Sequence, residues 1–413
     1  MPLPAHRLAG HTVTASRVAA LMLVAVLSAT CSCSAAPRPV DGLTALAPIN
    51  RQAVPVADEA RVHRGEIVVV DDHAQYAADL LNASASVKRA VYRSTSGVTG
   101  QPVQVAGIFA VPKGTPPSGG WPVVSVGHGT TGIEHGCGPS RQPDLMGYQS
   151  TVTGLLSAGF AVAMSDYQGL DDVGVHAYLE PRSAAYDVID AVRALGRLFP
   201  DVSTRWAAFG GSQGGQAAWA ANELNSEYGQ DLQLVGTVAL APPANIAAMA
   251  ELAYRNQLSA EQQAAFPLVI VGLERAGLLA TSTPYLRGAA KPTEPDILGC
   301  GAVATRKRSS LRSEDVGPDS DAAAEDLQRA LREIALPQQP LSAPMAVING
   351  SRDEIVLPAW VEFAVESSCR LGGDIQHVEL SEADHSGGFP YGDIEQWLTD
   401  RFANRPTAST CSE

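Results

Sequence analysis

The chain has 413 residues, of which 45% are hydrophobic and 17% charged, and this composition excludes a disordered tail. It suits a large globular fold or a domain with a sizeable insertion. Residues 1–35 contain two arginines and no acidic residue, so the rest of the chain carries 27 basic and 43 acidic residues. So negative a protein is a poor candidate for binding nucleic acid or anionic membrane surfaces.

The first element of the chain is a targeting segment. Two basic residues precede the apolar run "VAALMLVAVLSA", which gives way to the small residues "TCSCSAA". Because the run is too short to span a membrane, residues 1–35 are predicted to be a signal peptide, and the protein to be secreted or held at the cell envelope. Two modes of processing stay open, namely cleavage after Ala35 or lipid attachment at Cys31 or Cys33.

A linker and a set of antiparallel strands are predicted next. Residues 36–62 are rich in alanine and proline without periodicity, which indicates a linker or a loosely ordered arm. Strand-like runs follow at 65–72, 87–94 and 103–112, and the turn sequence "TSGVTGQP" joins the last two.

From residue 121 the pattern changes to apolar strands alternating with helices. The strands are predicted at 121–129, 159–169, 206–213 and 234–243, and the helices at 182–199 and 214–224. Unbroken apolar strands with helices between them are typical of a parallel sheet covered on both faces. The predicted fold class is therefore α/β, with residues 63–243 as the first part of the core.

The alternation stops for about a hundred residues, and we expect residues 244–340 to form an inserted helical cap or lid. This stretch holds helical patterns and the very apolar "FPLVIVGLERAGLLA", which suits a cover over the strand ends. Packing alone is the other interpretation. The strand and helix pattern resumes in residues 341–413, the second part of the core.

The segment "AAFGGSQGGQAAWA" is interpreted as a nucleophile elbow. Ser212 stands between Gly210 and Gly214, where side chains would collide with the neighbouring strand or helix at so sharp a turn. An ordinary Gly/Ser turn is the alternative, because G-x-S-x-G is a short motif.

Serine needs a histidine to take its proton and a carboxylate to orient that histidine. Asp353 follows a strand predicted at 344–350, and His385 follows one predicted at 375–380, in the chain order Ser, Asp, His of an α/β-hydrolase. Glu354 is the rival acid. The other candidates are interpreted as structural, solvent-facing or in the wrong chain order: His377, Asp384, His128, His135 and His176.

The oxyanion of the transition state needs hydrogen-bond donors. The backbone N–H of Gln213, directly after the nucleophile, is the first candidate. The second is expected from the loop "GHGTTG", which includes Gly129 and Thr130, unless that loop is only a tight turn.

Seven features, in order along the chain, resemble the secretory lipase family of α/β-hydrolases: "GHGTTG", "SDYQGL" with a following "YL", "AAYDVIDAVRA", "GGSQGG", the long insertion, "DEIVLPAW" and "DHSGG". The resemblance implies that fold for residues 65–405, with Ser212, Asp353 and His385 as the triad. It also implies an oxyanion role for Asp166 in "SDYQGL", so Asp166 and Thr130 remain alternatives for the second donor.

The sequence therefore predicts an exported serine ester hydrolase, a lipase or carboxylesterase that needs no metal or cofactor. Its partner would be an ester or lipid substrate whose acyl chain lies under the apolar cap, and the cap is a candidate for contact with lipid aggregates. An exported peptidase or acyltransferase and a catalytically silent binding module are the alternatives.

Two disulfides are expected from the four cysteines that follow the signal peptide, and three pairings are possible. Cys369 with Cys411 and Cys137 with Cys300 is the favoured pairing.

Overall fold

The computed structural model describes residues 45–411 apart from 72–74, 172 and 295. The predicted signal peptide, including Cys31 and Cys33, lies outside the described residues. In the part of the chain that is described, no helix is both long and apolar enough to cross a membrane.

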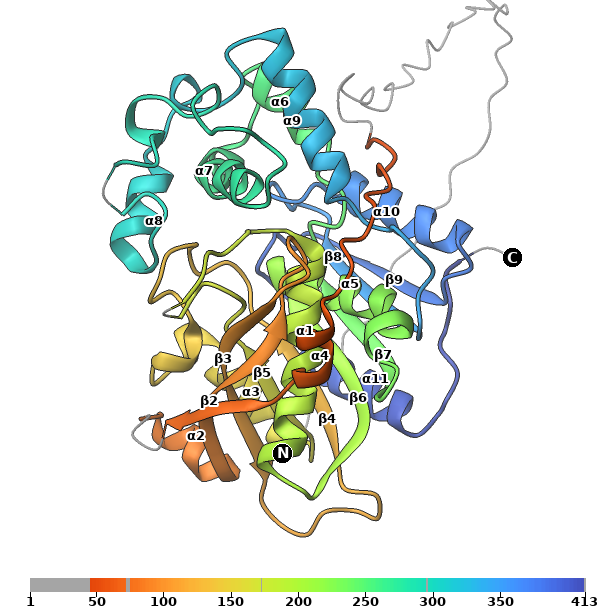
Figure 1. The fold of residues 1–413 in the computed structure, drawn as a ribbon. Coiled ribbons are helices and arrows are strands. Elements are labelled where there is room, and N and C mark those ends of the chain that lie inside the picture. Colours follow the sequence, from red (N-terminus) through yellow and green to blue (C-terminus); the bar gives the residue numbers. More distant parts are fainter. Residues whose placement is uncertain (1–44, 72–74, 172, 295, 412–413) are drawn as a thin grey trace, which may run out of the picture. The chain divides into compact units, whose positions relative to one another are not determined.

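A nine-stranded sheet forms the centre of the fold (Figure 1). Its order is β1-β2-β3-β5-β4-β6-β7-β8-β9, and the strands from β5 to β9 in that order are parallel, whereas β1, β2 and β3 pair antiparallel. The predicted antiparallel opening and parallel core are therefore present. The strands are β1 (Ile67–Asp71), β2 (Ser84–Thr95), β3 (Pro102–Pro112), β4 (Trp121–Gly127), β5 (Ala161–Ser165), β6 (Val202–Gly211), β7 (Gln233–Leu240), β8 (Met345–Gly350) and β9 (Ile375–Leu380).

Helices cover both faces of the sheet because alternate side chains of each strand point to opposite faces. On β6, Trp206 and Ala208 pack into one buried cluster, and Ala207 and Phe209 into the other. The first cluster is completed by α4 (Pro181–Leu198), α5 (Gln213–Tyr228) and α10 (Pro358–Arg370); the second by α2 (Ala78–Ala83), α3 (Gln149–Ser157) and α11 (Tyr391–Phe402).

The insertion between β7 and β8 forms a separate layer with a hydrophobic core of its own. It contains α6 (Met249–Tyr254), α7 (Ala260–Arg275), α8 (Gly301–Ser309) and α9 (Asp321–Glu333), which gather beyond one end of the sheet (Figure 1). The apolar segment "FPLVIVGLER" is the C-terminal part of α7, and Leu268, Val269 and Ile270 are at most 2% exposed within this core. These side chains thus pack the cap itself.

The two disulfides have the pairing that the sequence favoured. Cys137 is bonded to Cys300, and Cys369 to Cys411, with Cα–Cα distances of 5.5 Å and 5.4 Å. The first bond ties the loop after β4 to the cap, and the second ties the C-terminal segment to the end of α10.

The described part of the alanine- and proline-rich segment differs from the loose arm that was expected. Ile49 donates its N–H to the carbonyl of Arg332 on α9 at 2.9 Å, and the Arg332 side chain donates to the carbonyl of Ala47 at 2.8 Å. The segment ends in α1 (Asp58–His63). Backbone hydrogen bonds to the cap therefore fix this arm, which composition alone could not predict.

Candidate active site

The candidate nucleophile lies where β6 turns directly into α5. Ser212 has φ 54° and ψ −122°, a conformation that costs a non-glycine residue free energy and that is held here by the N–H of Ser212 donating to Leu240 O at 2.8 Å. The hydroxyl is therefore presented at the carboxyl edge of the sheet, at the N-terminus of α5.

The glycines of the elbow are required by close backbone contacts. A Cβ on Gly210 would stand 2.2 Å from the carbonyl oxygen of Gly214, and a Cβ on Gly214 would stand 1.9 Å from the carbonyl oxygen of Gly127. Both distances are far below van der Waals contact, so these positions accept only glycine in this turn. This geometry supports the elbow over an ordinary Gly/Ser turn.

The structure brings Ser212, His385 and Asp353 into one hydrogen-bonded row. His385 Nε2 lies 2.9 Å from Ser212 Oγ, and its Nδ1 lies 2.7 Å from Asp353 Oδ2. Because the Nδ1–H group donates a hydrogen bond to this carboxylate, Nε2 is the unprotonated ring nitrogen that can accept the serine proton. The side chain of Asp353 is fully buried and that of His385 is 11% exposed.

The loop after β8 fixes the carboxylate of Asp353. Oδ1 accepts the backbone N–H groups of Ile355 and Val356, both at 2.9 Å, which leaves Oδ2 for His385. Glu354, the rival acid, is exposed and its carbonyl accepts the hydroxyl of Ser259. The geometry thus favours Asp353 as the partner of His385.

The remaining histidines do not reach Ser212 by any hydrogen bond between described residues. His377 pairs with Asn349 across β8 and β9 at 2.7 Å, and His135 is exposed. His128 and His176 are buried, and burial lowers their pKa to about 4 and about 3, so both rings are neutral at pH 7.

The loop "GHGTTG" lies directly beside the serine. A Cβ on Gly129 would stand 3.8 Å from the Cβ of Ser212. The N–H of Gly129 donates to the hydroxyl of Tyr148 at 2.5 Å, and the hydroxyls of Thr130 and Tyr178 are 2.6 Å apart. Among the described residues, the N–H of Thr130 has no hydrogen-bond acceptor, whereas the N–H of Gly129 is occupied.

Gln213, which follows the serine, is only 2% exposed and contacts His176. The Nδ1–H of His176 donates to the carbonyl of Gln168 at 3.0 Å, so Nε2 accepts the side-chain amide N–H of Gln213 at 2.9 Å. This contact fixes the residue whose backbone N–H is the first oxyanion candidate.

Asp166 is completely buried at the end of β5, and its carboxylate is directed at another loop. Oδ1 accepts the N–H of Ser140 at 2.8 Å, and Oδ2 accepts the hydroxyl of the same residue. Burial raises the pKa of Asp166 to about 6, against the opposing effect of these hydrogen bonds. In the hydrogen bonds of the described chain, the carboxylate does not contact Ser212, Gln213 or Thr130.

Three side chains near the serine were missing from the sequence interpretation or assigned no part in it. They are Tyr148, Tyr178 and His176, which hold Gly129, Thr130 and Gln213, respectively. No motif marks Tyr148, and Tyr178 belongs to the "YL" that follows "SDYQGL" without a role assigned to it. Their contacts cross 19 and 48 residues of sequence, so only the fold reveals them. In the described residues, no group of three or more His, Cys, Asp or Glu side chains is arranged to hold a metal ion.

Helix α7 of the cap is attached at both ends to loops of the candidate site. At its N-terminus, Ser259 donates to Glu354 O at 2.8 Å and Gln262 to Ile355 O at 3.1 Å. At its C-terminus, Arg275 donates to Ile133 O at 2.5 Å and forms an ion pair with Glu134 at 2.7 Å. One helix therefore links the loop of the candidate acid to the loop that follows Thr130.

Residues 146–272 match the model of a family described as secretory lipase. A secreted triacylglycerol lipase of Malassezia furfur is 25% identical over 264 residues, which are 59% of this chain and 48% of that lipase. A probable inactive lipase of Mycobacterium tuberculosis is 23% identical over 352 residues, which are 79% of this chain and 76% of that protein. The chain thus spans about half the length of the first relative, and the family match confirms the resemblance found in the motifs.

Solved structures show the same fold. The ligand-bound rice cell wall degrading esterase LipA of Xanthomonas oryzae has a TM-score of 0.64 and 21% identity, over 82% of this chain and 98% of that chain. The closed state of Candida antarctica lipase A has a TM-score of 0.66 and 16% identity, over 86% of each chain. The predicted α/β-hydrolase fold is confirmed.

Proposed function

From its similarity to the secretory lipases, we propose that this chain is an exported serine hydrolase of carboxylic esters. Ser212 is the nucleophile, His385 the general base and Asp353 the group that orients His385. The observation that carries the proposal is the hydrogen-bonded row from Ser212 Oγ through both ring nitrogens of His385 to Asp353 Oδ2. Because the N-terminal segment 1–35 has the pattern of a signal peptide, export is part of the proposal.

The reaction proceeds through an acyl-enzyme. Ser212 Oγ attacks the ester carbonyl while its proton passes to His385 Nε2, and the resulting imidazolium then donates that proton to the leaving alcohol. A water molecule, deprotonated by His385, hydrolyses the acyl-serine and restores the free hydroxyl. Asp353 keeps the proton of Nδ1 in place throughout, since its second oxygen is held by two backbone N–H groups.

The oxyanion is stabilised by the N–H groups of Gln213 and Thr130. Both belong to segments that adjoin Ser212, and neither donates to an acceptor among the described residues. Gly129 serves differently, because its N–H is held by Tyr148 and so positions the loop. Asp166 braces the loop of Ser140 as a hydrogen-bond acceptor, which is the role its two contacts support.

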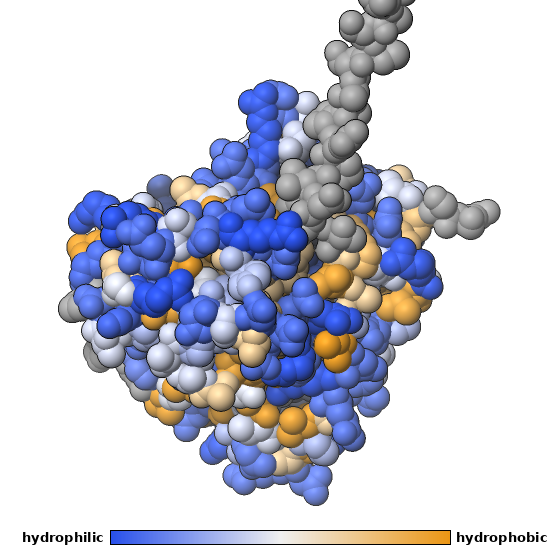
Figure 2. All heavy atoms as spheres, turned by 90° about the horizontal axis from the view of Figure 1, so that it is seen from above, coloured by the Kyte–Doolittle hydropathy of each residue, from blue (hydrophilic) through white to orange (hydrophobic). Residues whose placement is uncertain are grey.

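The substrate is a dispersed ester rather than one taken from a lipid aggregate. Helix α7 is anchored at both ends, so the cap has no free end near the serine that could swing open at an interface. Figure 2 shows the molecule from the side of the cap, where hydrophilic residues predominate and hydrophobic ones are scattered. Surfaces that bind lipid typically carry a large contiguous apolar patch, and no such patch is visible among the described residues in this view.

A series of p-nitrophenyl esters, from acetate to palmitate, tests the proposal. The protein without residues 1–35 should hydrolyse the shorter esters, and Ser212→Ala should lose that activity while its circular dichroism spectrum is unchanged. Amide substrates and alcohol acceptors in the same assay distinguish a peptidase or an acyltransferase. A folded wild-type protein that hydrolyses none of the esters would instead resemble its relative that is named a probable inactive lipase.

A further inference from the structure

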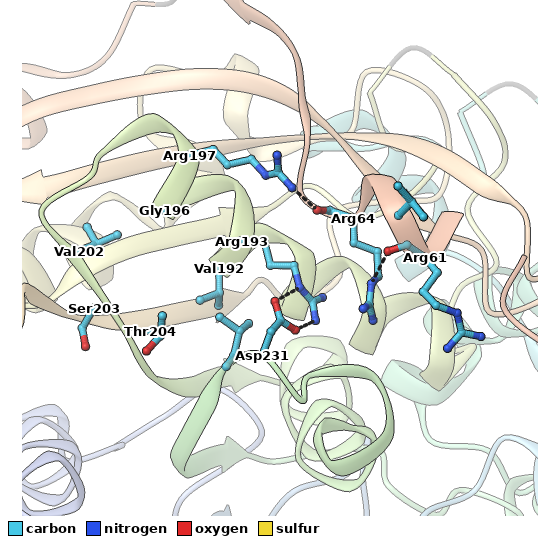
Figure 3. A pocket seen from close by; sticks show the side chains of 12 residues that line it. Arg61, Arg64, Val192, Arg193, Gly196, Arg197, Val202, Ser203, Thr204 and Asp231 are labelled. Carbon is cyan, nitrogen blue, oxygen red and sulfur yellow. Dashed lines mark hydrogen bonds and ion pairs between the residues drawn. The ribbon is translucent and has the colours of Figure 1, made fainter. Parts of the chain in front are cut away.

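A cavity of about 380 Å³ lies at the opposite end of the sheet from Ser212. It is lined by the C-terminal turns of α4, by the start of β6 and by α1, and Figure 3 shows its side chains. Thr204 lines the cavity and Ser212 follows the other end of the same strand, so roughly 26 Å separates the two at about 3.3 Å per residue. The cavity is therefore separate from the candidate active site.

Arginine dominates the charge of this cavity. Four of its twelve lining residues are arginines and one is acidic, although acidic residues outnumber basic ones 43 to 29 in the whole chain. The four are Arg61, Arg64, Arg193 and Arg197. A local excess of positive charge in so acidic a protein attracts anions to this one position.

Arg193 is already neutralised by carboxylates. Its guanidinium donates to Asp190 at 2.6 Å and makes a two-pronged contact with Asp231, the acidic residue of the lining (Figure 3). It also donates to the carbonyl of Tyr228 at 2.6 Å. Asp190 and Asp231 thus hold the Arg193 side chain in one position on the lining of the cavity.

Arg64 is held beside Arg193 without a carboxylate. Its Nη1 donates to the same Tyr228 carbonyl at 2.6 Å, its Nε donates to Arg61 O at 3.1 Å, and its guanidinium carbon lies 4.6 Å from the centre of the Tyr228 ring. Two guanidinium groups therefore share one carbonyl oxygen. Since carboxylates already offset the charge of Arg193, the charge of Arg64 is the one that an anion bound beside it would neutralise.

Arg61 and Arg197 complete the arrangement. Arg197 donates to the carbonyl of Arg64 at 3.1 Å, and Arg61 donates to the carbonyl of Val56 at 3.4 Å. Within the described residues, no carboxylate lies within 4 Å of Arg61, Arg64 or Arg197. Each guanidinium has five N–H donors, so most of the donors on these three side chains remain available.

We propose that this cavity binds the phosphate group of an anionic ligand. Guanidinium donors match the oxygens of a phosphate, and the carbonyl of Tyr228 holds the guanidinium groups of Arg64 and Arg193 side by side (Figure 3). The cavity is larger than one phosphate needs, so it accepts a phosphate that is attached to a larger molecule, either soluble or as a lipid headgroup. Asp231 does not neutralise the other three arginines, because both of its oxygens accept hydrogen bonds from Arg193.

Thermal unfolding with inorganic phosphate as the probe tests the site. At constant ionic strength, 20 mM phosphate in place of chloride should raise the Tm of the full protein by about 2 °C or more, because a ligand that binds only the folded state stabilises it. Arg197→Gln and Arg64→Gln should each reduce this rise by at least half. Arg370→Gln is the matched control, since Arg370 is an exposed arginine on α10 that lies outside the cavity, and it should keep the full rise.

A second experiment distinguishes a lipid headgroup from a soluble ligand as the source of the phosphate. Sedimentation with phosphatidylglycerol vesicles but not with phosphatidylcholine vesicles, reversed by inorganic phosphate, would support a lipid headgroup; a rise in Tm without sedimentation would support a soluble ligand. An equal rise in the Arg197→Gln protein, or no rise in the wild type, would overturn the site. Ester hydrolysis should be unchanged in all three variants, so the outcome is independent of the proposed function.

Discussion

The side-chain Oδ2 of Asp187, inside α4, accepts the backbone N–H of Gln168 at 2.7 Å, and no part of Asp187 is exposed to solvent. Burial raises the pKa of this carboxyl to about 8, and the nearby carboxylates of Asp190 and Glu180 act in the same direction. Gln168 in turn accepts a hydrogen bond from His176, which holds Gln213. Asp187, which titrates, is therefore linked through Gln168 and His176 to Gln213 of the candidate oxyanion site.

This pKa predicts that the stability contributed by Asp187 is lost as the pH rises. The folded protein keeps a proton on Asp187 that the unfolded chain releases near pH 4, so the contribution of this group to the free energy of unfolding decreases between about pH 4 and pH 8. The slope for one such group is on the order of 1 kcal/mol per pH unit. Asp187→Asn cannot titrate and still accepts from Gln168, so its Tm should fall less than that of the wild type between pH 5 and pH 8.

Glu223 is buried too, and burial raises its pKa to about 8. The slope in the Asp187→Asn protein should therefore be reduced and not abolished. Scanning calorimetry of both proteins at pH 5, 6, 7 and 8 provides the comparison. Parallel curves for the two proteins would show that Asp187 is ionised throughout this range.

Substitutions of Asp166 distinguish two models of the oxyanion site, in which the second donor is either the N–H of Thr130 or the side chain of Asp166. As an acceptor for Ser140, it can be replaced by asparagine with kcat within about threefold of the wild type, because the amide keeps an oxygen for the N–H of Ser140. Asp166→Ala should lower stability by roughly 1–3 kcal/mol, the cost of an unsatisfied buried donor. An alanine variant with wild-type stability and a kcat lowered about a hundredfold or more would assign the donor role to Asp166.

Matched substitutions of Asp353 and Glu354 test which of these adjacent residues orients His385. Asp353→Asn should lower kcat by a factor on the order of 10³–10⁴, since the amide favours the wrong tautomer of His385. Glu354→Gln should change kcat by no more than about twofold, because that side chain is exposed. Steady-state kinetics on one ester suffices, and the reverse pattern would make Glu354 the acid.

The anchored cap predicts a smooth response to substrate concentration. The rate with tributyrin should follow a simple saturation curve through the solubility limit of the ester, because Arg275 and Ser259 hold α7 in place without an interface. A titration of tributyrin in a pH-stat measures this. A severalfold rise in rate at the solubility limit would mean that the cap opens on lipid.

Much of the fold was predictable because its signals are local. Apolar strands separated by helices predicted the parallel sheet, and the glycines around Ser212 predicted the turn that Gly210 and Gly214 make possible. Chain order and the ends of β8 and β9 sufficed to select Asp353 and His385, which do lie in contact.

The rest depends on contacts between distant segments. Tyr148 occupies the N–H of Gly129, which a loop motif cannot show, and Asp166 points at Ser140 although its motif suggested the serine. The apolar stretch around Leu268 could have lined an acyl site as easily as a core, because hydrophobicity alone does not distinguish the two. Helices α3 and α10 were likewise not predicted from the sequence.

Reaction with a p-nitrophenyl alkylphosphonate measures whether Ser212 is an activated nucleophile. We expect one equivalent of p-nitrophenolate released per chain, a mass increase on the peptide that contains Ser212, and loss of ester hydrolysis in proportion to labelling. Ser212→Ala should release none and remain folded. Labelling of another residue, or undiminished hydrolysis by the Ser212→Ala protein, would contradict the account.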